Sequence, residues 1–128
     1  MVEYLFDKSR RLVPLTAAVF GKAGVRRAQV ALAPWATHSV LSYDLVEAAG
    51  YDPSTSGVRI RLATVTGIVS AQVVTVDKIS VLGREAKKIG VACVDLPAEV
   101  RLSGILGQNF LRGFRLTMDP GAGMLTLD

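Results

Sequence analysis

The chain has 128 residues and a mass of 13.6 kDa, with 50% hydrophobic and 20% charged residues, which is the composition of one globular domain and leaves no room for two. It has one cysteine, Cys93, and one histidine, which excludes an internal disulfide and the usual zinc sites built from several cysteines and histidines. We therefore expect a cytoplasmic protein that needs no metal or other cofactor to fold.

The fifteen basic and eleven acidic residues give a net charge of +4, and the basic residues are scattered along the chain. Aromatic residues make up 6% of the chain and do not alternate with the charges, so we do not expect nucleic acid as a partner. The apolar stretches are well short of the roughly 20 residues that a membrane helix requires. We therefore expect no membrane partner either.

Alternation of apolar and polar residues dominates the sequence and predicts strands. Residues 13–20 and 25–32 have this pattern and are separated by a glycine-bearing turn at 21–24, so they predict a hairpin. Ser42 then provides a helix cap before residues 43–49, and Gly50 can adopt the left-handed conformation that ends a helix. The pattern predicts one short helix near 42–49, ended by the segment around Pro53.

The second half repeats the strand pattern. Residues 58–63 and 68–76 predict a hairpin with its turn at 64–67, and further strands are predicted at 79–82 and 88–94 with a turn near 83–85. One helical turn is predicted near 108–112, ended by Gly113, and a last hairpin at 114–118 and 124–127. The pattern predicts an all-β domain over residues 13–128, preceded by an N-terminal arm at 1–12 that either frays or pairs with a second subunit.

Three segments resemble one known family, the single-domain retropepsin-like aspartic proteases of bacteria and retroviruses. Residues 31–42 (ALAPWATHSVLS) stand where the family has an apolar run, then Asp-Thr-Gly-Ala, then a Ser/Thr-rich entry to a helix. Residues 103–111 (SGILGQNFL) resemble the second landmark, two apolar residues and a glycine before a short helix, and residues 64–68 fall where a flap hairpin would cover the active site. The resemblance implies a closed β-barrel of the acid protease type and a homodimer.

The chain departs from the family at the catalytic motif. The alignment places Ala33 at the aspartate, Pro34 at the threonine and Trp35 at the glycine. In the family, each of two subunits supplies one aspartate, and the pair shares a proton so that one carboxylate acts as base and the other as acid. A methyl group cannot titrate, proline has no hydroxyl for the usual lattice across the two-fold axis, and an indole is far larger than glycine.

No other residue is predicted to replace the missing aspartate. None of the eleven acidic residues precedes Thr-Gly or Ser-Gly. His38 lacks an orienting acid, although Ser39 or Ser42 can be imagined as its nucleophile, and we interpret it as a capping or packing residue. Cys93, between Ala92 and Val94, is interpreted as a small buried hydrophobe. We therefore predict no catalytic residue in this chain.

The sequence leaves three functional interpretations open. In the first, the chain is a catalytically inactive homologue whose former groove binds an extended peptide or protein segment, with Trp35 either on the dimer axis or filling the core. The predicted groove and flap residues are Trp35, Ala36, Thr66, Gly67, Ile68, Ile105, Leu106 and Gly107. In the second, the chain is an aspartic endopeptidase whose motif has been altered. In the third, Arg59 and Arg61 bind an acidic partner or nucleic acid.

Overall fold

The computed structural model describes residues 2–5, 13–64 and 67–128, and in these ranges the chain forms ten strands, two short α-helices and two 3-10 turns. The strands are β1 (Val2–Leu5), β2 (Leu15–Gly21), β3 (Gly24–Leu32), β4 (Ser39–Leu41), β5 (Arg59–Thr64), β6 (Gly67–Val81), β7 (Arg84–Cys93), β8 (Gly104–Leu106), β9 (Leu116–Asp119) and β10 (Met124–Leu127). The helices are α1 (Tyr43–Ala48) and α2 (Gln108–Leu111), and the 3-10 turns are η1 (Pro53–Thr55) and η2 (Ala98–Val100). The predicted all-β class is confirmed.

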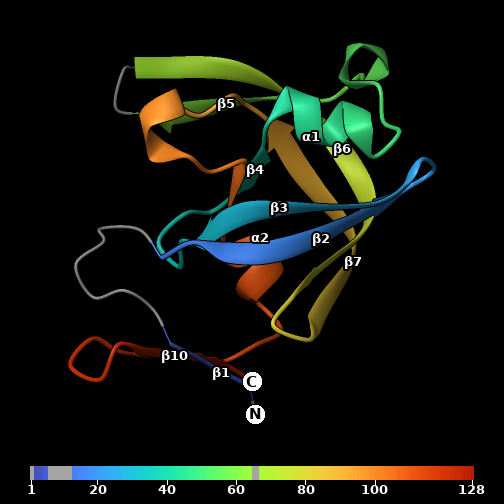
Figure 1. Ribbon diagram of the computed structural model, residues 1–128. Coiled ribbons are helices and arrows are strands. Elements are labelled where there is room, and N and C mark those ends of the chain that lie inside the picture. The colour runs from blue at the N-terminus through green and yellow to red at the C-terminus, as the bar shows by residue number, and fades with distance from the viewer. Residues whose placement is uncertain (1, 6–12, 65–66) are drawn as a thin grey trace.

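Six strands close into a barrel in the order β2-β3-β8-β4-β7-β6, and pairing of β2 with β6 closes the ring. β5 pairs with β6 and extends with it beyond the barrel as a hairpin (Figure 1). β3 and β8 run parallel, with Leu32 opposite Leu106. Because parallel neighbours end at the same edge, the residues that follow these two strands emerge side by side.

The barrel interior is filled by the alternating apolar residues that predicted the strands. In β2, Leu15, Ala17 and Val19 are buried while the residues between them are more exposed, so the alternate side chains of this strand point inward. Phe110 from α2 is the largest fully buried side chain of the core. At about 25 cal/mol per Å² of apolar surface, this burial is the main source of stability.

β6 and β7 are longer than predicted. The sequence suggested a break in β6 around Asp77 and a start of β7 at Lys88, but both strands run continuously past these residues. β6 stays extended because it changes partner, from β5 at one end to β2 at the other, while β7 covers its opposite edge. Lys88 has φ +53 within β7, so the interruption expected there is a local left-handed residue and not the end of the strand.

The predicted helices are confirmed. The Ser42 hydroxyl accepts a hydrogen bond from the Leu45 N–H at 3.3 Å and caps α1, and Gly50 follows the helix with φ +102. The expected stop near Pro53 is the short turn η1, capped by Asp52. The turn η2 was not predicted, and none of the helices in the described ranges is long and apolar enough to cross a membrane.

A second, three-stranded sheet in the order β1-β10-β9 lies beside the barrel (Figure 1). Its buried residues Leu125 and Leu127 belong to the same hydrophobic core as the barrel. The β1 strand of the N-terminal arm pairs antiparallel with β10 of its own chain, with Val2 opposite Leu127. Pairing of this arm with a second subunit stays a prediction, and residues 6–12 lie outside the described ranges.

Candidate functional site

The loop after β3, whose residues the resemblance aligns with the family's catalytic motif, forms a tight turn. The Ala36 N–H donates to the Ala33 carbonyl at 2.9 Å, which makes Pro34 and Trp35 the two central residues of a β-turn. Proline suits the first central position because its φ is already near −65°. The Ala33 side chain is buried, whereas Pro34 is exposed and 75% of the Trp35 surface is accessible. The interpretation of Trp35 as core filler is therefore wrong for the described chain.

The segment from β8 to α2 holds this loop in place. The Ala33 N–H donates to the Leu106 carbonyl at 2.8 Å, and the Gln108 N–H donates to the Ala36 carbonyl at 2.7 Å. The Gln108 side-chain amide donates to the Pro34 carbonyl at 2.9 Å. A Cβ on Gly107 would lie 2.5 Å from the Ala36 carbonyl oxygen, so only glycine permits this approach. This contact explains the glycine after the two apolar residues of the second landmark.

A buried polar network lies beneath the loop. Ser39 is completely buried, and its hydroxyl donates to Asn109 Oδ1 at 2.6 Å and accepts from the Gly107 N–H at 2.9 Å. Asn109 Nδ2 donates in turn to the Gly90 carbonyl at 2.8 Å. Because both functions of the Ser39 hydroxyl are used and it is out of solvent, it is not a nucleophile for His38. The sequence did not reveal this network, although two polar residues directly after an apolar landmark were a signal for it.

The predicted groove residues come from three places in the fold. Ala36 and Gly107 are in contact at the base of the loop, while Leu106 is fully buried and Ile105 partly so. Ile68, on the β5–β6 hairpin, is 64% exposed, and Gly67 has φ +126 at the end of that hairpin. Thr66 lies outside the described ranges.

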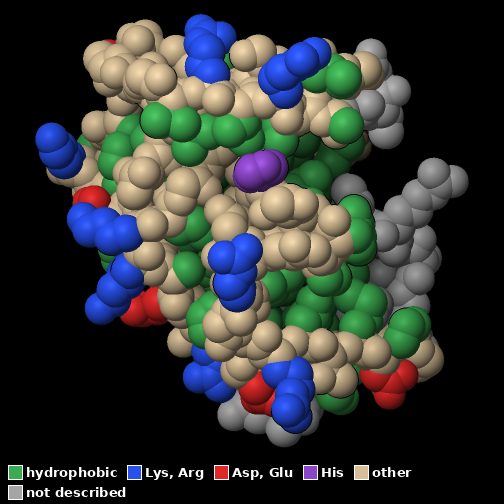
Figure 2. Space-filling view, turned by 180° about the vertical axis from the view of Figure 1, so that it is seen from behind, with side chains coloured by type: hydrophobic (Ala, Val, Ile, Leu, Met, Phe, Trp, Pro, Cys, Tyr) green, Lys and Arg blue, Asp and Glu red, His purple; other side chains and the backbone are tan. Residues whose placement is uncertain are grey.

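The end of the hairpin at which β5 stops and β6 starts, where Thr64 pairs with Gly67, lies on the same side of the barrel as the loop after β3, the left in Figure 1. Figure 2 shows hydrophobic side chains gathered along this same side, which is the right of that view. Arg59 and Arg61 are exposed on β5, and alternate residues of a strand share a face, so these two point away from the half-buried Ile60 and Leu62.

The titratable groups give no acid–base pair at this site. No aspartate or glutamate occurs within residues 31–42 or 103–113. In the described ranges no group of three or more His, Cys, Asp or Glu side chains could hold a metal ion. His38 is exposed in the loop. Burial raises the pKa of the Cys93 thiol to about 11, and the charges of Asp95 and Glu47 act in the same direction, so this thiol is protonated at neutral pH.

Comparison with known proteins agrees with this geometry. A family model described as "Aspartyl protease" matches residues 15–110, which include the loop after β3, β8 and all of α2 except Leu111. A retropepsin-like aspartic protease from Rickettsia conorii has a similar structure, with a TM-score of 0.68 and 18% identity over 98% of this chain and 88% of that one. The Simian Foamy Virus (mac) protease has a TM-score of 0.51 and 15% identity over 77% of this chain and 91% of that one. No curated protein sequence matches significantly. The chain therefore belongs to the aspartyl protease family and has the retropepsin-like fold.

Proposed function

We propose that this chain is a catalytically inactive member of its family, whose former active-site groove binds an extended peptide or protein segment within a homodimer. The observation that carries the proposal is Ala33. It stands at the end of β3, where its N–H is held by the Leu106 carbonyl and its side chain is a buried methyl group. A methyl group can neither activate a water molecule nor protonate a leaving amine, which are the two tasks of the aspartate pair.

The surroundings of Ala33 support loss of catalysis without loss of the scaffold. The backbone groups of Ala33, the Pro34 carbonyl and the Ala36 carbonyl all have protein partners, so the loop is rigidly held. These contacts also stabilise the fold, so they are compatible with a scaffold that has lost catalysis. The retained architecture is consistent with a loop that serves binding.

Peptide binding is supported by the exposed apolar side chains on this side of the barrel. Trp35 and Ile68 are 75% and 64% exposed, and large apolar side chains grouped on one face mark binding surfaces more often than chance. An extended segment between the hairpin and the loop would cover apolar surface and use strand-type backbone bonds. Because the loop carries no carboxylate, such a segment would be held and not cut.

The same tryptophan supports a homodimer. In a two-fold dimer each residue near the axis meets its own copy, and the resemblance places Trp35 in the motif that the family uses at its two-fold axis. Burying most of an exposed indole is worth about 3 kcal/mol per copy before the entropy cost of association. We expect Trp35→Ser to weaken self-association at least about tenfold in sedimentation equilibrium, with Val58→Ser, on another exposed apolar residue, as the matched control.

The decisive experiment is a proteolysis assay. Casein and an oligopeptide library are incubated with the unaltered chain at acid and neutral pH, with and without pepstatin, and we expect no cleavage. Pepstatin-sensitive cleavage would overturn the proposal. A variant carrying Ala33→Asp, Pro34→Thr and Trp35→Gly serves as the positive control for the assay and for the scaffold.

The alternative is an aspartic endopeptidase whose motif has been altered in this chain. The intact hydrogen bonding around the loop favours this alternative as a second candidate. Sequencing of the source gene across codons 33 to 35 separates the two: an Asp-Thr-Gly sequence there, together with activity of the triple variant, would establish the alternative. If the natural gene encodes Ala-Pro-Trp at these codons, the proposal of a catalytically inactive peptide-binding homologue stands.

A further inference from the structure

The outer edge of β6 is interrupted far from the loop after β3. β5 pairs with this edge as far as Gln72, and β2 pairs with it from Lys78 onward. Between them, residues 73–77 have no strand on this side, although β7 covers the other edge of β6. The four residue-to-residue steps from Val73 to Asp77 span about 13 Å. In Figure 1, α1 and η1 lie over this part of the molecule, on the other side from the loop after β3.

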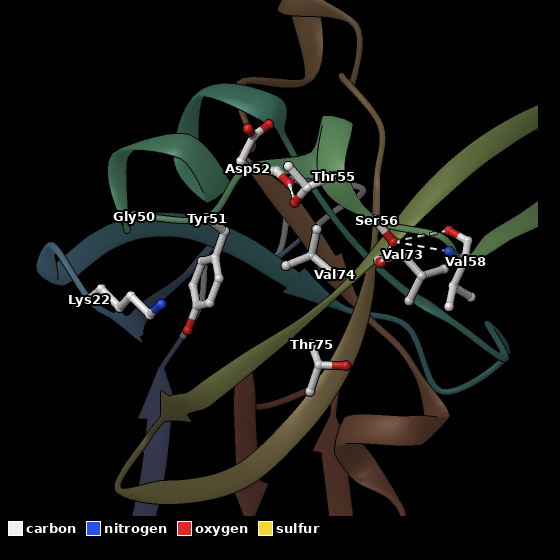
Figure 3. Close-up of a pocket in the computed structure, with 10 residues that line it drawn as sticks. All are labelled: Lys22, Gly50, Tyr51, Asp52, Thr55, Ser56, Val58, Val73, Val74 and Thr75. Carbon is white, nitrogen blue, oxygen red and sulfur yellow. Dashed lines mark hydrogen bonds between the residues drawn. The ribbon is translucent and has the colours of Figure 1, made fainter.

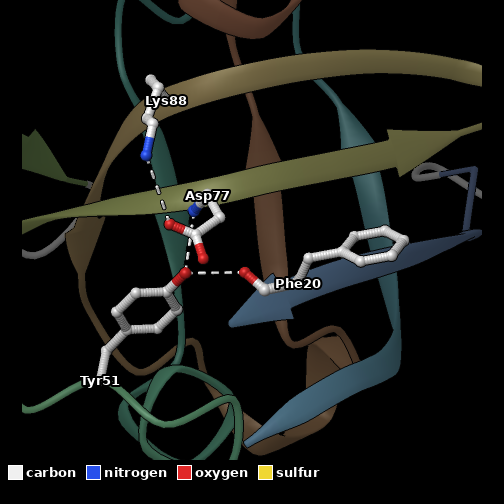
Figure 4. Close-up of polar contacts among 4 residues, drawn as sticks. All are labelled: Phe20, Tyr51, Asp77 and Lys88. Carbon is white, nitrogen blue, oxygen red and sulfur yellow. Dashed lines mark hydrogen bonds and ion pairs between the residues drawn. The ribbon is translucent and has the colours of Figure 1, made fainter. Parts of the chain in front are cut away.

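Loop and side-chain atoms replace the missing strand at the two ends of the gap. At one end the Val73 N–H donates to the Val58 carbonyl at 2.9 Å, and the Ser56 hydroxyl donates to the Val73 carbonyl. At the other end the Asp77 N–H donates to the Tyr51 hydroxyl at 2.8 Å, as Figure 4 shows. The ends of the gap are therefore closed.

The Tyr51 hydroxyl in turn donates to the Phe20 carbonyl of β2 at 2.7 Å. Burial raises the pKa of this phenol, so it stays protonated at neutral pH and keeps both bonds. Its ring stands as a fixed wall of the gap.

Thr75 lies midway between these two ends. Successive odd-numbered residues of β6 direct their backbone groups to the same edge, so the Thr75 N–H and C=O point into the gap beside those of Val73 and Asp77. In the described ranges neither group has a protein partner. One donor and one acceptor are thus left side by side, which is the arrangement that a residue of a neighbouring strand would satisfy.

A cavity of about 470 Å³ opens at this point (Figure 3). Tyr51, Val58, Val73, Val74 and Thr75 line it on the β6 side. The rest of the lining is mostly polar and consists of Lys22, Gly50, Asp52, Thr55 and Ser56. Val58 is 57% exposed, so apolar surface is available for a ligand to cover. The volume is within the range of small-ligand sites.

We propose that this notch, defined by Tyr51, Val58, Val73 and Thr75, binds one apolar residue of an extended peptide, a site separate from the former catalytic groove. The bound residue donates its N–H to the Thr75 carbonyl and accepts from the Thr75 N–H, while its side chain packs on Val58. The filled ends of the gap exclude a longer strand, so the site recognises a single residue flanked by its two peptide groups. The proposal does not depend on whether the protein is a protease.

The test uses N-acetyl-valine methylamide, which is one residue with a peptide group on each side. Titration of the ¹⁵N-labelled chain with millimolar probe is followed by amide chemical shifts. We expect a saturable shift of the Thr75 amide. The analogue methylated on the valine nitrogen cannot donate to the Thr75 carbonyl, and we expect it to bind at least about fivefold more weakly.

Two variants test the same contact from the protein side. Thr75→Pro removes the N–H that faces the open edge, where proline is tolerated, together with the hydroxyl, and should abolish binding. Thr75→Val keeps the N–H and removes the hydroxyl, and should bind as the unaltered chain does. No saturable shift at Thr75, equal binding of the two probes, or shifts confined to residues 33–36 would each overturn the proposal. The probe comparison decides the matter even where Thr75→Pro does not fold.

Discussion

Replacing Gly107 by alanine tests whether the close contact between the loop after β3 and α2 supports the site. A Cβ on Gly107 would lie 2.5 Å from the carbonyl oxygens of both Ala36 and His38, and both are backbone atoms that a side-chain rotation cannot move. Gly107 has φ −103, so backbone conformation adds no penalty. Overpacking costs typically 1–3 kcal/mol, and the displacement also weakens the Gln108–Ala36 and Gly107–Ser39 hydrogen bonds at about 1 kcal/mol each.

We therefore expect Gly107→Ala to lower the free energy of unfolding by about 3 kcal/mol. Urea denaturation measures this: with a slope of about 2 kcal/mol per M, the midpoint should fall by roughly 1.5 M. Gly57→Ala is the matched control, because its Cβ meets no atom within 4 Å, and it should stabilise by about 0.4–1 kcal/mol through the unfolded state. If the free energy of unfolding of Gly107→Ala lies within about 0.5 kcal/mol of that of the unaltered chain, the close contact at Gly107 does not support the fold as we argue.

Three further predictions concern the side chains of Ser39 and Cys93, which are buried, and of Tyr51, which is partly buried. Ser39→Ala should lower the free energy of unfolding by about 2–3 kcal/mol in urea denaturation, because it leaves Asn109 Oδ1 and the Gly107 N–H without partners. A decrease of less than about 0.5 kcal/mol would contradict this expectation. Tyr51→Phe should lower the free energy of unfolding by about 1–2 kcal/mol and expose the Asp77 amide to hydrogen exchange. Unchanged protection of this amide would contradict the hydrogen bond from the Asp77 N–H to the Tyr51 hydroxyl. Cys93 should react with a thiol reagent only on unfolding near neutral pH. Because the pKa of this thiol rises from 9.0 to about 11 on folding, the thiol ionises first in the unfolded state. The free energy of unfolding should therefore fall as the pH rises through this interval. If the free energy of unfolding of the unaltered chain shows the same pH dependence as that of Cys93→Ala, the prediction is refuted.

Elements that depend on neighbouring residues were predictable from the sequence. The hairpin of β2 and β3, the cap of α1 at Ser42 and its end at Gly50 all follow from contacts a few residues apart. The continuity of β6 past Asp77 was not predictable, because it rests on the exchange of β5 for β2 as partner strand. No local pattern reports such an exchange.

The candidate site shows the same division. The positions of Ala33 and Gly107 were identified from short motifs, but the network of Ser39 and Asn109 joins residues 70 positions apart. The sequence likewise did not decide whether the Trp35 side chain fills the core or lies on a dimer axis, and only the structure shows that it is exposed. Both depend on how the β3 and β8 ends meet, which is a matter of barrel closure.

The amino-acid sequence alone determined that this domain is built from strands and that residues 31–42 carry no carboxylate, because alternation and residue identity are local properties of the chain. The tertiary structure decided which polar groups are left over once the barrel closes. Parallel pairing of β3 with β8 gave the loop after β3 its partners, and the gap between β5 and β2 left Thr75 without one. Hydrogen bonds between strands that are distant in the sequence depend on strand register and on closure of the barrel, and no single segment of the chain determines either.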